Sequence, residues 1–202
     1  MINFFCCNNN CFDKLRFYEI WKFMDIVSDI DRIASKYGLE VIASEQTCIK
    51  CNNTCNISYD KGNNDIYVQY YFDKEKYDES VHYEIRYHKN NKKIYVEFHI
   101  ENKDNDPFII KIKADLEKAS SHSEYRFRNK RSKDTPTEFD IDDLTGIKDA
   151  FEELVKKVES VKQMIAIAEM VNKTRRKHVA KIFSKYRKQL YQLRYRKKLL
   201  GN

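Results

Sequence analysis

Hydrophobic and polar residues alternate through much of the first half of the chain, whereas in the second half the hydrophobic residues recur every three or four positions. Alternation is typical of β-strands whose two faces have different surroundings, and the longer spacing is typical of helices. We therefore expect an α+β fold. It would comprise an N-terminal helix, an antiparallel meander of four to six strands, and a long C-terminal helical pair or hairpin.

The N-terminal helix is expected to begin at Met24. Ile26 and Ile30 follow at helical spacing, and Gly38 stands just beyond the last turn, where a C-terminal cap favours glycine. Residues 1–23 differ from the rest of the chain, because they contain the run CCNNNC and a group of aromatic side chains. We interpret them as an appendage to a helix-plus-sheet domain.

That domain is expected to cover residues 24–135. Its strands follow one another with short polar loops and no helix between them, which favours antiparallel pairing. The expected strands are residues 41–47, 55–60, 65–73, 81–88, 93–101 and 107–115, with a shorter one at 124–128.

A turn centred on Asn90 and Asn91 would set the register of the two strands with the clearest pattern. In that register every pair on one face is apolar, as where Tyr83 stands opposite Phe98. A one-residue slip would move all of these side chains to the other face, so the pattern itself specifies the pairing.

The other face of this hairpin is polar. It carries four titratable side chains, His82, Glu84, Glu97 and His99. The register sets the two glutamates opposite each other, and facing carboxylates are destabilising unless a positive group lies nearby. Lys111 and Lys113, on the next expected strand, would supply that charge. Alternatively, two imidazoles and two carboxylates on one patch would hold a divalent metal ion.

The end of the second hairpin strand suggests a further alternative. The sequence Glu101-Asn102-Lys103 places a carboxylate two residues before a lysine, as in some metal-dependent nucleases. The central residue of that arrangement is usually apolar, and no matching aspartate stands out upstream. A nuclease is therefore the second alternative function and not the first.

The chain contains six cysteines, and an intracellular protein keeps its thiols reduced. Two residues separate Cys48 from Cys51, which is the spacing of a zinc knuckle, and Cys55 follows closely. Cys7 and Cys11 would supply the other half of such a site. Cys48 and Cys51 are therefore candidate zinc ligands, with inert thiols as the alternative.

A heptad pattern covers the next segment, residues 136–171. Its apolar positions are Leu144, Ile147, Phe151, Leu154, Val158, Val161, Ile165 and Ala168. Such a seam predicts a helix suited to a coiled coil or to a protein partner. Residues 172–174 are the expected break, so this half would contain either two helices or one helix that runs through both segments.

Residues 172–202 are expected to form a basic amphipathic helix. From Val171 to the C-terminus there is no Asp or Glu, while twelve residues are cationic: Lys173, Arg175, Arg176, Lys177, Lys181, Lys185, Arg187, Lys188, Arg194, Arg196, Lys197 and Lys198. The whole chain has a formal charge of +7, so this segment carries +12 and the remainder −5. Solvated helix faces normally mix both signs, and this one does not.

Cations of this density neutralise phosphates and release counterions, and the tyrosines among them can stack on unpaired bases. We therefore expect a non-catalytic protein that binds RNA, DNA or a nucleoprotein complex through these twelve residues. The first alternative is a protein-interaction or inhibitor protein of a mobile element, for example one that blocks a nucleic-acid-guided defence complex. A basic amphipathic helix also suits a membrane surface, but the broad polar face and the tyrosines make this less favoured.

The location is expected to be cytoplasmic. The start MINFFCC lacks the basic residues and the long apolar stretch of a secretory signal. No apolar run approaches the roughly 20 residues that a membrane span requires.

Overall fold

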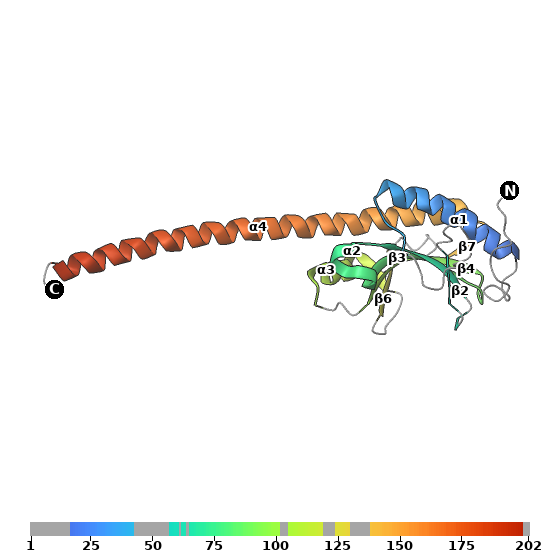
Figure 1. Ribbon diagram of the computed structural model, residues 1–202, viewed down its shortest axis with the longest axis horizontal. Coiled ribbons are helices and arrows are strands. Elements are labelled where there is room, and N and C mark those ends of the chain that lie inside the picture. The colour runs from blue at the N-terminus through green and yellow to red at the C-terminus, as the bar shows by residue number, and fades with distance from the viewer. Residues whose placement is uncertain are drawn as a thin grey trace. The chain divides into compact units, whose positions relative to one another are not determined.

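The structure is a computed structural model that describes residues 17–42, 57–60, 62–63, 65–101, 105–118, 124–129 and 138–199. It confirms the α+β class, with an N-terminal helix, an antiparallel sheet and a long C-terminal helix (Figure 1). The chain divides into two compact units, Met1–Glu159 and Ser160–Asn202, and each is described by itself.

The described residues form four α-helices and one 3₁₀ turn: α1 (Phe17–Lys36), α2 (Lys74–Tyr77), η2 (Asp78–Ser80), α3 (Pro107–Asp115) and α4 (Leu144–Leu199). Seven strands form one sheet: β1 (Ser58–Asp60), β2 (Asp65–Tyr71), β3 (Val81–His88), β4 (Lys93–Glu101), β5 (Leu116–Lys118), β6 (Glu124–Asn129) and β7 (Glu138–Asp140). Their order is β1-β2-β3-β4-β6-β5, and β7 also pairs with β4. Strands β1 to β4 therefore form the expected meander, whereas β6 lies between β4 and β5 in the sheet.

The central hairpin has the predicted register. Tyr83 pairs with Phe98, Glu84 with Glu97, and all eight β3–β4 pairs agree with a turn at Asn90 and Asn91. We call the face that carries Tyr83 and Phe98 the core face, because both side chains are fully buried there. The opposite face is called the outer face.

The expected start of the first helix at Met24 is wrong, because α1 begins at Phe17. Phe23, within the N-terminal half of this helix, is completely buried, so apolar packing extends the helix toward the N-terminus. The C-terminal cap is confirmed. Gly38 has a φ of +68°, and the amide of Leu39 donates to the carbonyl oxygen of Ala34 at 3.0 Å, as in a Schellman motif.

The strand expected at 107–115 is also wrong, because these residues form helix α3. Pro107 occupies the first turn, where its missing N–H removes no hydrogen bond, and the Asp106 carboxylate accepts from the amide of Phe108 at 2.7 Å. Ile109 is buried while Ile110 is 60% exposed, which is a helical pattern and not an alternating one.

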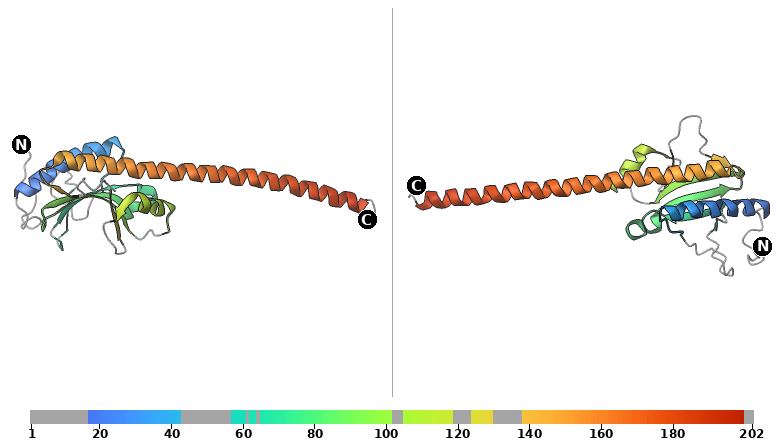
Figure 2. Two further views of the ribbon diagram at one scale, coloured as in Figure 1. Left: turned by 180° about the vertical axis from the view of Figure 1, so that it is seen from behind. Right: turned by 90° about the horizontal axis from the view of Figure 1, so that it is seen from above.

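Two helices cover the core face of the sheet, α1 and the first part of α4 (Figure 2). They run in the same direction, since Lys22 pairs with Asp142 near their starts and Lys36 pairs with Glu152 further along. The Phe151 ring lies 5.7 Å from that of Tyr70 on β2. The part of the heptad seam that lies in the first unit, which includes Phe151, therefore packs in the core of that unit.

The helix α4 begins at an aspartate cap, because the Asp143 carboxylate accepts from the amide of Gly146 at 2.9 Å. It then continues for 56 residues through the expected break at 172–174. Thr174 does not interrupt it, since its hydroxyl donates to the carbonyl oxygen of Met170 in the preceding turn. The hairpin alternative is thus wrong and the single helix is confirmed.

Other expected elements are only partly described. Of the strand expected at 41–47, Val41 forms an isolated bridge with Tyr70, and residues 43–47 lie outside the described residues. The short strand expected at 124–128 is confirmed as β6. Among the described residues, no helix has both the length and the apolar character that crossing a membrane would require.

Candidate functional site

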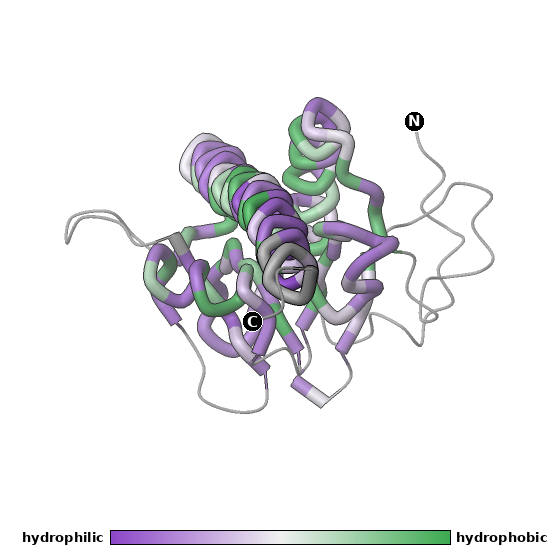
Figure 3. Tube along the Cα trace, turned by 90° about the vertical axis from the view of Figure 1, so that its left-hand side faces the viewer, coloured by the Kyte–Doolittle hydropathy of each residue, from purple (hydrophilic) through white to green (hydrophobic). Residues whose placement is uncertain are grey.

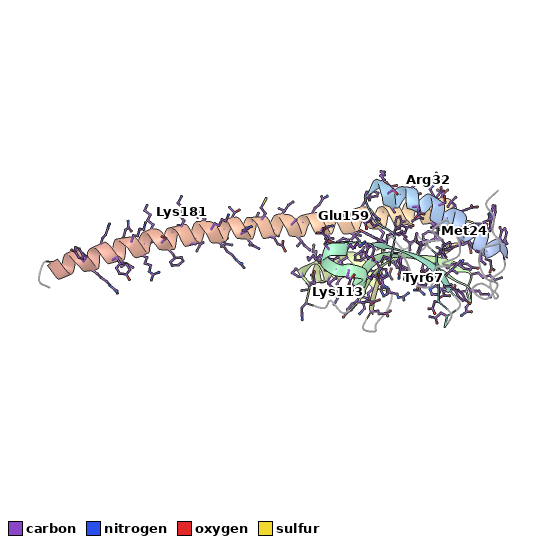
Figure 4. All side chains as sticks on the ribbon, in the orientation of Figure 1. Met24, Arg32, Tyr67, Lys113, Glu159 and Lys181 are labelled. Atoms are coloured by element: carbon purple, nitrogen blue, oxygen red, sulfur yellow. The ribbon has the colours of Figure 1, made fainter. Side chains whose placement is uncertain are left out.

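The basic segment of α4, which we call the tail, comprises residues 171–199. Its described cationic side chains are all exposed: Lys173, Arg175, Arg176, Lys177, Lys181, Lys185, Arg187, Lys188 and Arg194. Figure 4 labels Lys181 among the side chains that project from this helix. The side chains of Arg196, Lys197 and Lys198 lie outside the described part. The next acidic residue back along the chain is Glu169, so the tail contains no carboxylate of its own.

The tail has two distinct rows of side chains, both exposed. Helical spacing gathers Lys177, Lys181, Lys185 and Lys188 into one row. The same spacing gathers Val179, Ile182, Tyr186 and Leu190 into a second row on another side of the helix. Figure 3 shows the resulting mixture of hydrophilic and hydrophobic positions along α4. We call these the lysine row and the apolar row.

The heptad seam has no single role. Its members from Ile147 to Val158 are buried in the first unit, where Phe151 contacts Tyr70 and Tyr83, and Leu144 is half-buried. Further along, Ile165 is half-buried and Ala168 is exposed. Nothing in the described residues therefore supports a coiled coil over the whole predicted segment, because half of the seam is already used by the sheet.

The outer face of the sheet carries a second group of polar side chains, which we call the outer-face cluster. It consists of Gln69, His82, Glu84, Arg86, Glu97, His99, Arg126 and Arg128. The histidines and glutamates were predicted from the hairpin register, and the register places them as expected. Both glutamates are almost completely buried, although they lie opposite the core face.

The expected neutralisation of these glutamates by Lys111 and Lys113 is wrong, because both lysines belong to helix α3. Arginines supply the charge instead. Arg86 donates to both carboxylate oxygens of Glu84, at 2.7 and 3.1 Å. Arg128 donates to Glu97 at 3.0 Å. The alternation of Glu124, Arg126 and Arg128 was the available signal for β6, but nothing local indicated that β6 pairs with β4.

Arg126 lies between several carboxylates. Its NH1 atom is 3.4 Å from Glu84 Oε1 and 3.6 Å from Glu97 Oε2, and its NH2 atom is 3.6 Å from Glu124 Oε2. Burial works against the charged form of Glu84, but its neighbours His82 and Arg86 hold the pKa of this carboxyl well below its usual range. Glu84 is therefore ionised at neutral pH although it is buried.

Both histidines of the outer-face cluster contact neighbouring polar groups. His82 Nδ1 is 2.7 Å from the carbonyl oxygen of Glu79, which can only accept, so Nδ1 carries a proton. The Gln69 amide donates to Glu84 at 2.8 Å, and its nitrogen is also 2.9 Å from His82 Nε2. His82 Nε2 therefore contacts Gln69 and also lies 3.7 Å from Glu84 Oε2.

His99 lies beside His82 on this face. His99 Nδ1 is 3.0 Å from His82 Nε2, and the other ring nitrogen of His99, Nε2, faces Glu124. This atom is buried, without a hydrogen-bond partner, and 3.3 Å from Glu124 Oε2. Burial, followed by the neighbouring His82, lowers the pKa of His99 to about 4, which agrees with a neutral ring at pH 7.

Two groups of potential metal ligands share His99. The first is His82, Glu84 and His99, and the second is His99, Glu101 and Glu124. Within each group the ligand atoms lie within 4.8 Å of one another. Both histidines and Glu84 were predicted for such a role from the sequence, but Glu124 was not, because that residue reaches the cluster only through the β4–β6 pairing.

The candidate zinc ligands Cys48 and Cys51 lie outside the described residues, so the zinc hypothesis stays a prediction. Asn102 and Lys103 of the nuclease hypothesis also lie outside them, and only Glu101 of that group is described. Comparisons with protein-family models, with curated proteins and with solved structures gave no match.

Proposed function

We propose that the protein is a non-catalytic nucleic-acid-binding protein whose tail contacts the phosphate backbone. One observation carries this proposal: the described cations of the tail are exposed on a continuous helix that holds no acidic residue after Glu169. Without a polyanion, like charges at neighbouring helical positions repel one another. Phosphates would relieve that repulsion and release condensed counterions to the solvent.

Phosphate contacts position a protein on nucleic acid without reading its sequence. The exposed rings of Tyr186, Tyr191 and Tyr195 stand among the cations and offer stacking surfaces for unpaired bases. The proposed activity is therefore binding with little sequence preference, to RNA or to DNA, alone or in a nucleoprotein complex.

The test is the salt dependence of binding by the full-length protein. Wild type should bind labelled single- and double-stranded oligonucleotides with an affinity that falls steeply as salt rises. Replacing Arg175, Arg176 and Lys177 with Gln should flatten the slope of log K against log salt by about 2–3 units on duplex DNA, because each phosphate contact contributes roughly 0.9.

A matched control separates the position of the charges from their number. The variant with Lys89, Lys92 and Lys111 replaced by Gln loses the same three charges from the first unit, and it should keep the wild-type slope. If the tail variant instead keeps the wild-type affinity and slope, this part of the tail is not the contact surface. If wild type binds neither RNA nor DNA at low salt, the proposal is wrong.

The apolar row supports a second candidate function, which is binding to another protein. Val179 and Ile182 are each 42% exposed, and the exposed fractions of Tyr186 and Leu190 are larger. These four side chains form an apolar surface that a partner helix would cover. Replacing Ile182 and Leu190 with Gln distinguishes the two functions. It should leave phosphate binding unchanged but abolish a complex that survives nuclease treatment.

A further inference from the structure

We propose that His99, Glu101 and Glu124 bind one divalent metal ion, of the class of Mn²⁺, where β4 pairs with β6. This site lies on the sheet of the first unit and is independent of the proposed function of the tail. It differs from the predicted zinc site at Cys48 and Cys51, because it contains only nitrogen and oxygen ligands.

The pairing of β4 with β6 brings the three side chains together. Glu101 stands directly opposite Glu124, and His99 lies two residues before Glu101 on the same face of β4. Their ligand atoms fall within 4.8 Å of one another. Both glutamates are only partly buried, so solvent reaches part of the site.

Two carboxylates that face each other across a strand pair destabilise the sheet unless a positive charge lies between them. Arg126 is a described cation beside this pair, and its NH2 atom is 3.6 Å from Glu124 Oε2. Arg126 also lies close to the carboxylates of Glu84 and Glu97, so its single positive charge is shared among several carboxylates. A bound divalent ion would add positive charge between the two carboxylates.

His99 points its buried Nε2 atom into this group. This atom lacks a hydrogen-bond partner and lies 3.3 Å from a carboxylate oxygen of Glu124. A metal ion between this nitrogen and the carboxylate oxygen would be bound by both. His99 Nδ1 lies 3.0 Å from His82 Nε2, so the second ring nitrogen has an outer partner, as is usual for a metal-binding histidine.

The other group, His82, Glu84 and His99, is less suited to a metal ion. Both oxygens of Glu84 already accept hydrogen bonds from Arg86, and Arg126 lies 3.4 Å from Oε1. An ion there would replace these contacts and sit beside two guanidinium groups. We therefore assign the metal to the solvent-facing group.

The donor set indicates the kind of ion. One imidazole and two carboxylates suit Mn²⁺, Fe²⁺ or Zn²⁺, whereas thiolates would select softer ions. Mn²⁺ is the appropriate probe, because carboxylates favour it and cysteine thiols compete poorly for it. Its loss from solution can be followed directly by electron paramagnetic resonance.

The experiment titrates full-length, metal-stripped protein with Mn²⁺. Wild type should bind one ion per chain, and its melting temperature should rise with Mn²⁺ concentration, because the ion binds only the folded state. Glu124→Gln and Glu101→Gln should each weaken binding by more than about 10-fold, which is the loss seen even when an outer-shell partner is changed. Glu117→Gln, an exposed carboxylate on the neighbouring strand β5, should bind as wild type does.

Stability without metal gives an independent readout. Removing either facing carboxylate should leave the metal-free melting temperature unchanged or raise it, because it removes a like-charge pair. Addition of Mn²⁺ should then stabilise wild type but neither variant. The proposal is overturned if wild type shows no saturable binding at millimolar Mn²⁺, or if both variants bind as tightly as Glu117→Gln.

Discussion

Phe98 shows how completely individual side chains are enclosed by the core face of the sheet. The ring is inaccessible to solvent, lies 5.0 Å from the ring of Tyr83, and lies 5.4 and 5.8 Å from Phe72 and Phe108. The last two contacts come from a loop and from helix α3. One residue therefore connects the central hairpin to two other parts of the first unit.

Replacement of Phe98 by Ala should destabilise the protein by about 3–5 kcal/mol, because a fully buried ring leaves a cavity. Urea unfolding measures this change. Ile110→Ala is the matched control on an exposed apolar side chain, and it should change stability by no more than about 0.5 kcal/mol. Equal losses for the two variants would mean that the faces of the sheet or of α3 are assigned incorrectly.

Not every residue of the outer-face cluster could be inferred from the sequence. The hairpin register fixed His82, Glu84, Glu97 and His99 on one face, since a short turn and strict alternation are local signals. Two of the arginines that neutralise the glutamates are on β6, more than twenty residues further along the chain. Pairing at that distance depends on how the intervening helix packs, and no local pattern encodes it.

At the scale of elements, α3 shows how a short apolar segment fits two periods. Phe108, Ile110 and Ile112 alternate as in a strand, whereas Phe108, Ile109 and Ile112 share one side of a helix. The N-terminal cap at Asp106, followed by Pro107 in the first turn, favours the helix. In contrast, the apolar residues of the heptad seam at the start of α4 fit only the helical spacing over several turns, and the helix there was predicted correctly.

The pair α1–α4 is also held by charges at its surface. Glu152 on α4 accepts from Lys36 at 2.9 Å and from Tyr37 at 3.0 Å, and Lys156 lies 3.1 Å away. The hydrogen bond from Lys36, followed by those from Lys156 and Tyr37, lowers the pKa of Glu152 from 4.5 to about 2. An acid whose pKa is lowered on folding stabilises the folded state while it is ionised.

This stabilisation should be fully present above pH 4.5 and disappear as the pH falls toward 2. The variant Glu152→Gln lacks it at every pH, so the difference in stability between wild type and variant should shrink over that interval. Urea unfolding at several pH values measures the difference, and added salt should reduce it because the pair is exposed to solvent. Glu117→Gln, away from this pair, should show no such trend, and a constant Glu152→Gln difference would contradict the assignment.

At the scale of the whole molecule, burial changes along α4. Its apolar residues from Ile147 to Val161 are buried, whereas the described ones from Ile167 to Tyr195 are exposed. Helices without tertiary packing are only marginally stable in water. The two units should therefore differ in stability even though one helix contributes to both.

Thermal unfolding should reveal this difference. Far-UV circular dichroism reports all helix and should decline gradually, because the tail loses structure before the packed first unit. Near-UV circular dichroism, dominated by buried tyrosines such as Tyr70 and Tyr83, should instead show one cooperative transition at higher temperature. Superimposable curves would show that the tail and the first unit unfold together.

The absence of a break at 172–174 gives the tail a defined reach. From Val171 to Leu199 an uninterrupted α-helix rises by about 43 Å, at about 1.5 Å per residue. Laid along a duplex, that length matches about 13 base pairs at about 3.4 Å each, a little more than one turn of the double helix. The length of the continuous tail helix would thus set the spacing between neighbouring molecules on one nucleic acid.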